Sequence, residues 1–384
     1  MRPLPTKGDY EHCNHRARDD VARQRGDRSP ARKHCRRPAN ECDSRAVHVY
    51  LDRENDLEAS IWRQATDLGW LTLALPEAHG GLGMGARGLQ VLNRELGERT
   101  APGAFAPTLC AAQWIASIGS DGLRGELLPA VVAGELKIAV PTLETAGPLS
   151  LAGGKVSGQI DLLGSADTGI AAVPVGADGW ALVRIDGSAA VLTPIDNWDR
   201  TREIYRLECR DATVAGVIAD PDGKVGALLG TYIAIALAAD SIGAANNIAY
   251  KTIEYLKERV QFERPIASFQ AIKHRAADLI GKITTQEALL EQAVQSADNG
   301  SPDSAMWARL AKAGATDAFA FVARDCIQLH GGVGHTWEYD PHIYMKRARL
   351  NEGLLNNNRA LRDNAVQSLN RALAEGRTTT ELDW

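Results

Sequence analysis

The sequence predicts an α+β multidomain protein. It has an N-terminal helical domain, a small middle β-sandwich or barrel domain and a C-terminal antiparallel four-helix bundle. Three observations support this class: apolar residues recur at helical spacing from about Leu51, β-rich runs alternate with turns up to Gly223, and long helical patterns return from Ala227. A chain of 384 residues can bury a large core in two or three domains. We expect the divisions 1–44, 45–136, 137–223 and 224–376.

Composition excludes several classes of protein. The formal charge of -5 and the pI near 6.0 argue against a nucleic-acid-binding protein. The longest apolar run, near 231–239, is shorter than a membrane helix requires, so we expect no membrane partner. No signal peptide is visible. Six scattered cysteines, at positions 13, 35, 42, 110, 209 and 326, favour free thiols in the reducing cytoplasm.

Residues 1–44 differ from the rest of the chain. They carry eleven Lys/Arg against seven Asp/Glu and show almost no apolar periodicity. We expect a disordered extension or an incorrectly assigned start, because such a segment buries too little surface to offset its ordering entropy. The segment also holds a group of potential metal ligands: His12, Cys13, His15, His34, Cys35 and Cys42. Their spacing fits none of the usual zinc patterns, so we assign no metal site.

The N-terminal helical domain begins with an apolar stripe at helical spacing. The stripe consists of Leu57, Ile61, Trp62, Ala65 and Leu68. Gly69 is a suitable C-cap. A rigid glycine-rich turn over 75–83 then precedes a second helix over about 87–97, and further helices continue to about Ala133.

The middle domain is predicted from β-rich runs separated by Gly, Asp and Pro. We expect strands over 137–140, 170–175, 180–185, 189–192 and 212–218. From Ala227 the pattern returns to long amphipathic helices. We expect them over 230–261, 266–298, 303–329 and 341–374, joined by short loops as in an antiparallel bundle.

A glycine run follows the third of these helices in the sequence QLHGGVGHTWEYDP, residues 328–341. Glycine lets a backbone approach a ligand closely, and successive N–H groups can surround a diphosphate. Glycines also simply end helices, so the run by itself is weak evidence. It gains weight beside a second segment about 70 residues earlier, RVQFERPIASFQ, residues 259–270.

Together the two segments resemble the C-terminal half of the flavin-dependent acyl-CoA dehydrogenases. The sequence GW…LPEAHGGLGMG, within residues 69–85, resembles the start of that family's N-terminal domain, and the resemblance covers roughly residues 50–360. It implies the same order of domains, an FAD cofactor and oxidation of an acyl-CoA to the α,β-enoyl-CoA. It also implies an oligomer and an electron-transfer acceptor.

The resemblance implies six FAD-binding residues: Arg259, Phe262, Gln270, Gln328, Gly331 and Gly332. Arg259 would pair with the diphosphate across a dimer interface, and Phe262 would pack on the adenine. The structural alternative is that Arg259 caps a helix and Phe262 lies in the core. The chain departs from the family at Glu263, where glycine is usual. A carboxylate near a diphosphate is repulsive, by roughly 1 kcal/mol at a solvated 4 Å distance.

The family's catalytic base is not found at its expected position. Most members carry a Glu-Gly pair, whereas counting from Ala348 places Leu355 there. Glu352-Gly353 occurs about one turn too early. A minority place the base on the first bundle helix, where this chain has Ile233, and Asp240 falls one to two turns further on. We therefore assign no catalytic residue.

The flavin-ring face of the β domain is also incomplete. Thr142 and Glu144 only partly match the family's Thr-Glu-Pro segment, and no Trp-Ile pair follows. These losses resemble subunits of the heteromeric acyl-CoA dehydrogenases of actinobacterial sterol side-chain catabolism, in which two homologous chains share a site. Three hypotheses remain: a subunit whose partner supplies the base, a self-sufficient homotetramer using Glu352, and a flavin-free scaffold.

Overall fold

The computed structural model describes residues 42–143, 147–176 and 179–377. Every described residue belongs to one compact unit, Pro38–Trp384. The expected extension over 1–44 therefore lies almost entirely outside the described residues, as do five of the six potential zinc ligands. The remaining one, Cys42, is a buried free thiol, as are Cys110, Cys209 and Cys326.

The N-terminal region is helical, as predicted. It contains α3 (Ser44–Leu51), α4 (Leu57–Asp67), α5 (Gly85–Glu98), α6 (Phe105–Ile118) and α7 (Asp121–Val132), with 3-10 turns η3 (Trp70–Thr72) and η4 (Glu77–His79). Gly69 follows α4 with φ +70°, the left-handed conformation expected of a C-cap glycine.

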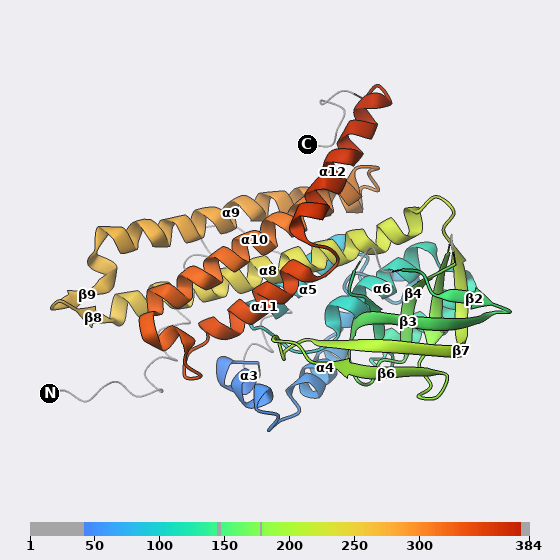
Figure 1. Ribbon diagram of the computed structural model, residues 1–384, viewed down its shortest axis with the longest axis horizontal. Helices are drawn as coiled ribbons and strands as arrows, with labels where there is room; N and C mark the ends of the chain where they lie inside the picture. Colours follow the sequence, from blue (N-terminus) through green and yellow to red (C-terminus); the bar gives the residue numbers. More distant parts are fainter. Residues whose placement is uncertain (1–41, 144–146, 177–178, 378–384) are drawn as a thin grey trace. The chain divides into compact units, whose positions relative to one another are not determined.

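The middle region is one seven-stranded sheet in the order β2-β3-β1-β4-β5-β7-β6 (Figure 1). The strands are β1 (Ile138–Pro141), β2 (Ser150–Ala152), β3 (Lys155–Gly164), β4 (Ile170–Val175), β5 (Gly179–Arg184), β6 (Ala190–Ile195) and β7 (Glu203–Ala219). The long β7 pairs with β5 through one part and with β3 through another, which closes the sheet into a barrel. Inward-facing apolar residues such as Leu162, Val173 and Leu207 fill it.

The sequence prediction missed β2, β3 and the first half of β7. In β7 the signal was present, because buried Tyr205, Leu207 and Cys209 alternate with exposed Arg206 and Glu208. In β3, two glycines and several polar residues weaken the β-strand pattern. That strand is stabilised mainly by its hydrogen-bonded partners β1 and β7.

The C-terminal region is a helical bundle (Figure 1). Its helices are α8 (Lys224–Glu258), α9 (Gln270–Asp298), α10 (Ser304–His330), α11 (Pro341–Gly353) and α12 (Asn358–Ala374). The first bundle helix, expected over 230–261, ends earlier than predicted. After Glu258 the chain turns into a hairpin of β8 (Val260–Gln261) and β9 (Arg264–Pro265). The 3-10 turns η5 (Ile266–Ser268) and η6 (Gly331–His335) precede α9 and follow α10.

The predicted fourth helix over 341–374 is wrong, since it is two helices. α11 ends at Gly353, and Leu355 adopts φ +67°, which a continuing helix does not allow. A buried lysine of α10 binds the carbonyl groups at this break, as described below. The loop between α11 and α12 is therefore a fixed feature of the fold.

The prediction that every bundle helix is amphipathic fails for α8, which is buried on nearly all sides over 229–249. It passes so close to α5 that a Cβ added at Gly243 would lie 2.1 Å from the Arg94 carbonyl oxygen. Among the described residues, α8 alone has the length and apolar composition of a membrane span. Within the window that meets this test, 78% is buried inside the protein, as expected of a central bundle helix.

Candidate functional site

The hairpin and the glycine run, which are distant in sequence, lie at the same end of the bundle (Figure 1). Tyr255, one turn before Arg259, stacks on His330, the residue before Gly331, with ring centroids 4.4 Å apart and planes 13° apart. The Tyr255 hydroxyl also donates to the His330 carbonyl at 3.3 Å. These contacts fix the end of α8 against the end of α10.

The six predicted cofactor residues are all exposed at this end of the bundle. Within the described part of the chain, no hydrogen bond or ion pair occupies the side chain of Arg259, Gln270 or Gln328. Gly331 has φ +69° and ψ -145°, a conformation that favours glycine, and a Cβ added there would meet open space. The arrangement therefore offers free polar side chains and accessible backbone to a ligand.

The hairpin tip is a two-residue turn formed by Phe262 and Glu263. Both have positive φ, +52° and +63°, as a type I′ turn requires, although glycine and asparagine adopt this conformation at lower cost. Phe262 is 86% exposed, and its ring is nearly perpendicular to that of Phe269, with centroids 6.0 Å apart. The alternative that Phe262 is a core residue is therefore wrong.

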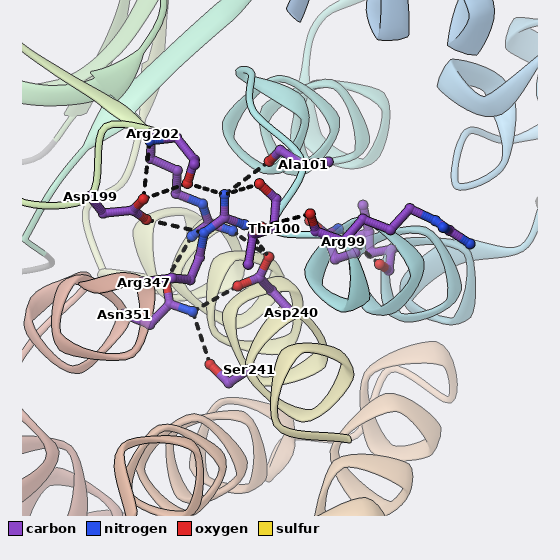
Figure 2. Close-up of polar contacts among 12 residues, drawn as sticks. Arg99, Thr100, Ala101, Asp199, Arg202, Asp240, Ser241, Arg347 and Asn351 are labelled. Carbon is purple, nitrogen blue, oxygen red and sulfur yellow. Dashed lines mark hydrogen bonds and ion pairs between the residues drawn. The ribbon is translucent and has the colours of Figure 1, made fainter. Parts of the chain in front are cut away.

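Asp240 is not available as a catalytic base (Figure 2). Its Oδ1 lies 3.0 Å from Arg347 Nη1 and 2.8 Å from Arg202 Nη2, and its Oδ2 accepts from Asn351 at 2.7 Å. Arg347 also binds Asp199 at 3.1 Å, so two guanidinium and two carboxylate groups neutralise each other. Burial opposes charge on Arg347, but the carboxylates of Asp240 and Asp199 raise the pKa of its guanidinium.

Glu352 is partly buried on α11, and its carboxylate binds Arg349 one turn earlier at 2.6 Å. Leu355 is 3% exposed, and its amide donates to the Thr142 carbonyl at the end of β1, at 2.6 Å. Leu143 and Leu355 also form an isolated parallel bridge. The resemblance places the base in the loop between α11 and α12. In this chain that loop is hydrogen-bonded to the residue after β1 and carries a leucine at the base position.

The same closure occupies the polar groups of Thr142. Its amide and hydroxyl both donate to the Asp161 carbonyl, at 3.0 and 3.3 Å, while its carbonyl accepts from Leu355. Leu162 and Leu163 on neighbouring β3 are buried. Glu144 lies outside the described residues. This face therefore leaves little room for a flavin ring, whereas the exposed end of the bundle keeps its polar side chains and glycine backbone accessible.

Lys312 is a structural residue that the sequence prediction missed. It is fully buried on α10, and its ammonium donates to the carbonyls of Glu352 (3.0 Å) and Asn356 (2.8 Å) and to Asn358 Oδ1 (3.1 Å). Burial lowers the pKa of Lys312 to about 7. Its position among Ala308, Ala311 and Ala315, on a small-residue face, was a usable sequence signal.

Two other titratable residues near the glycine run, His330 and Asp340, have structural partners. His330 Nδ1 donates to the Cys326 carbonyl at 2.8 Å, and burial lowers the His330 pKa. Burial opposes ionisation of Asp340, yet Lys251, His48 and Ser44 hold its pKa below the usual range. Within the described ranges no group of three or more His, Cys, Asp or Glu could hold a metal ion.

Comparison with known proteins gives consistent matches along the chain. Residues 28–135 match the family described as acyl-CoA dehydrogenase, N-terminal domain, and residues 231–354 match acyl-CoA dehydrogenase, C-terminal domain. Acyl-CoA dehydrogenase IpdE2 of Mycobacterium tuberculosis is 32% identical over 316 residues, which cover 81% of this chain and 86% of that protein.

Two solved structures share the fold. A variant of the Tcur3481-Tcur3483 steroid ACAD has a TM-score of 0.79 at 27% identity, covering 90% of this chain and 96% of that one. The ChsE4-ChsE5 complex from Mycobacterium tuberculosis has a TM-score of 0.78 at 24% identity, covering 91% of this chain and 97% of that one.

Proposed function

The chain belongs to the acyl-CoA dehydrogenase family, and we propose that it is the complementary subunit of a heteromeric enzyme whose catalytic base is carried by a homologous partner. The family oxidises acyl-CoA thioesters to α,β-enoyl-CoA, with FAD as the hydride acceptor. The observation that carries the proposal is the loop after α11. Leu355, where the family resemblance places the base, is buried and donates its amide to the Thr142 carbonyl.

In this proposal the chain contributes to a cofactor whose flavin ring lies on the partner. Arg259, Gln270 and Gln328 supply donors to the diphosphate, Phe262 covers the adenine, and the backbone at Gly331 and Gly332 allows close approach. Bound FAD would accept the β-hydride of the acyl-CoA. A carboxylate base must be desolvated and held against the α-carbon. Because this chain has no carboxylate at the expected position, a carboxylate of the partner would take the α-proton.

The substrate proposed is a bulky, steroid-derived acyl-CoA. Support comes from the steroid enzyme that shares the fold at 27% identity. Reoxidation of the flavin would require a separate electron-transfer protein. We place the enzyme in the cytoplasm, in keeping with the four buried free thiols among its described residues.

Co-expression with homologous acyl-CoA dehydrogenase chains, followed by flavin absorbance per chain, tests the proposal. We expect a hetero-oligomer with about one FAD per two chains. The affinity of the complex for FAD should fall about tenfold or more in the Arg259→Ala variant, since a charge-assisted hydrogen bond is removed. Arg359→Ala, an exposed arginine on α12, is the control.

Two outcomes contradict this assignment. A homotetramer with one FAD per chain, whose activity is lost in Glu352→Gln, would establish the self-sufficient enzyme. A complex that never binds flavin would establish the scaffold. In the proposed heteromer, Glu352→Gln leaves activity unchanged, because the Glu352 carboxylate is paired with Arg349 of the same helix.

A further inference from the structure

Glu263 is the residue at which the hairpin departs from the family, and its surroundings suggest a role. In the described part of the chain its carboxylate has no ion pair or hydrogen bond. The adjacent cation, Arg264, is instead held over the Phe269 ring, 4.0 Å from the centroid. The carboxylate therefore contributes nothing visible to the stability of this chain.

The backbone at Glu263 is also unfavourable for its own residue type. With φ +63° it occupies the left-handed region, which is costlier for a residue bearing a Cβ than for glycine. Phe262 has the same kind of conformation and is exposed. A strained, solvent-exposed pair is expected to persist where its side chains meet something outside the chain.

The hairpin register places Glu263 away from the arginine that would bind the diphosphate. The Ile266 amide donates to the Arg259 carbonyl at 2.9 Å, and the next pairs are Val260 with Pro265 and Gln261 with Arg264. At about 3.3 Å per residue, the tip lies about 10 Å beyond Arg259. Glu263 thus stands beside Phe262 at the hairpin tip, where the proposed function places the adenosine half of the cofactor.

A carboxylate only accepts hydrogen bonds, whereas the diphosphate offers none to accept. The adenosine half of FAD offers the adenine amino group and the ribose hydroxyls. We propose that Glu263 is an adenosine-recognition residue, which accepts a hydrogen bond from these donors on the FAD held by the Arg259 end of the bundle. This inference rests on the proposed function, since it requires that FAD.

FAD titration of the flavin-depleted complex, followed by flavin fluorescence, tests the inference. The direction in which FAD affinity changes on replacing Glu263 decides the outcome. Glu263→Gly should bind FAD about tenfold more weakly, because a hydrogen bond to a charged group is lost. Glu263→Gln keeps a neutral acceptor and should fall between wild type and Glu263→Gly. Glu258→Gln, the same charge change at an exposed site five residues earlier, should bind FAD as wild type does.

A second arm replaces FAD with the analogue whose adenine amino group is an oxo group. Weaker binding of the analogue to wild type, but not to Glu263→Gly, assigns the contact to the amino group. If Glu263→Gly loses the same affinity for FAD and for the analogue, the hydrogen bond is assigned to the ribose.

Three results would overturn the inference. Tighter FAD binding in Glu263→Gly would mean that the carboxylate repels the diphosphate. Unchanged FAD affinity would remove any role toward the cofactor. Unchanged FAD affinity with an altered ratio of co-purified partner would assign Glu263 to partner recognition instead. A wild-type complex without flavin contradicts the proposed function itself, and so differs from all three.

Discussion

At the scale of single residues, Lys312 shows how a buried charge can fix a loop. Its ammonium supplies three hydrogen bonds to the carbonyls and amide oxygen at the break between α11 and α12. These acceptors include the end of a helix, where a cation is favoured. Burial nevertheless dominates and lowers the pKa of Lys312 to about 7, from an ordinary value of 10.5.

This shift predicts a pH dependence of stability. Between about pH 7 and pH 10.5 the unfolded chain keeps the proton that folded Lys312 has released, so folding stability rises with pH across this window. Lys312→Met should lack this rise. Denaturant unfolding of both proteins at pH 7 and pH 10 measures the difference. The prediction would be contradicted if the free energy of unfolding changed by the same amount in both proteins between pH 7 and pH 10.

At the scale of elements, the tip of the β8–β9 hairpin presents two exposed side chains, Phe262 and Glu263, to solvent. Phe262→Ala should therefore change the free energy of unfolding by only about 0.5 kcal/mol, because the side chain is 86% exposed. If Phe262 covers the adenine as proposed, the same change should lower FAD retention in the complex, since that apolar contact is lost.

The control for this hairpin variant is Phe319→Ala in α10. Phe319 is fully buried, so its truncation should cost about 3–5 kcal/mol. Chemical denaturation and flavin absorbance, measured on the same samples, separate the two effects. A large loss of stability in Phe262→Ala would show that the hairpin serves the fold instead.

At the scale of the whole described unit, the buried charge network joins its three regions (Figure 2). Arg347 of α11 binds Asp240 of α8, Asp199 beside the barrel, and the carbonyls of Thr100 and Ala101 after α5. Because all these groups are buried, each charge depends on the others for compensation.

Arg347→Met should therefore destabilise the protein by about 3–5 kcal/mol, since it leaves two buried carboxylates to one arginine. Arg349→Met, two residues later and exposed, should change stability by about 0.5 kcal/mol or less. Thermal unfolding of both variants provides the comparison. Equal melting temperatures would indicate that the network contributes specificity without net stability.

Much of the fold could be predicted from the sequence because local patterns carry it. The glycine that ends α4, the strand β4 and the break at Gly300 all lie where turn chemistry and periodicity place them. The prediction failed where partners distant in sequence decide the structure. β3 is a strand because of β1 and β7, and the break after α11 is held by Lys312 from another helix.

The sequence by itself determined the family, the candidate FAD residues and the absence of a carboxylate at position 355, because each depends on residue identity and spacing alone. Only the tertiary structure decided that Phe262 is exposed, that Asp240 forms ion pairs with two arginines, and that Leu355 is hydrogen-bonded to Thr142. The last two facts join residues that lie far apart in the sequence. No local pattern encodes such pairings, because they arise only when the helices and the barrel pack against each other.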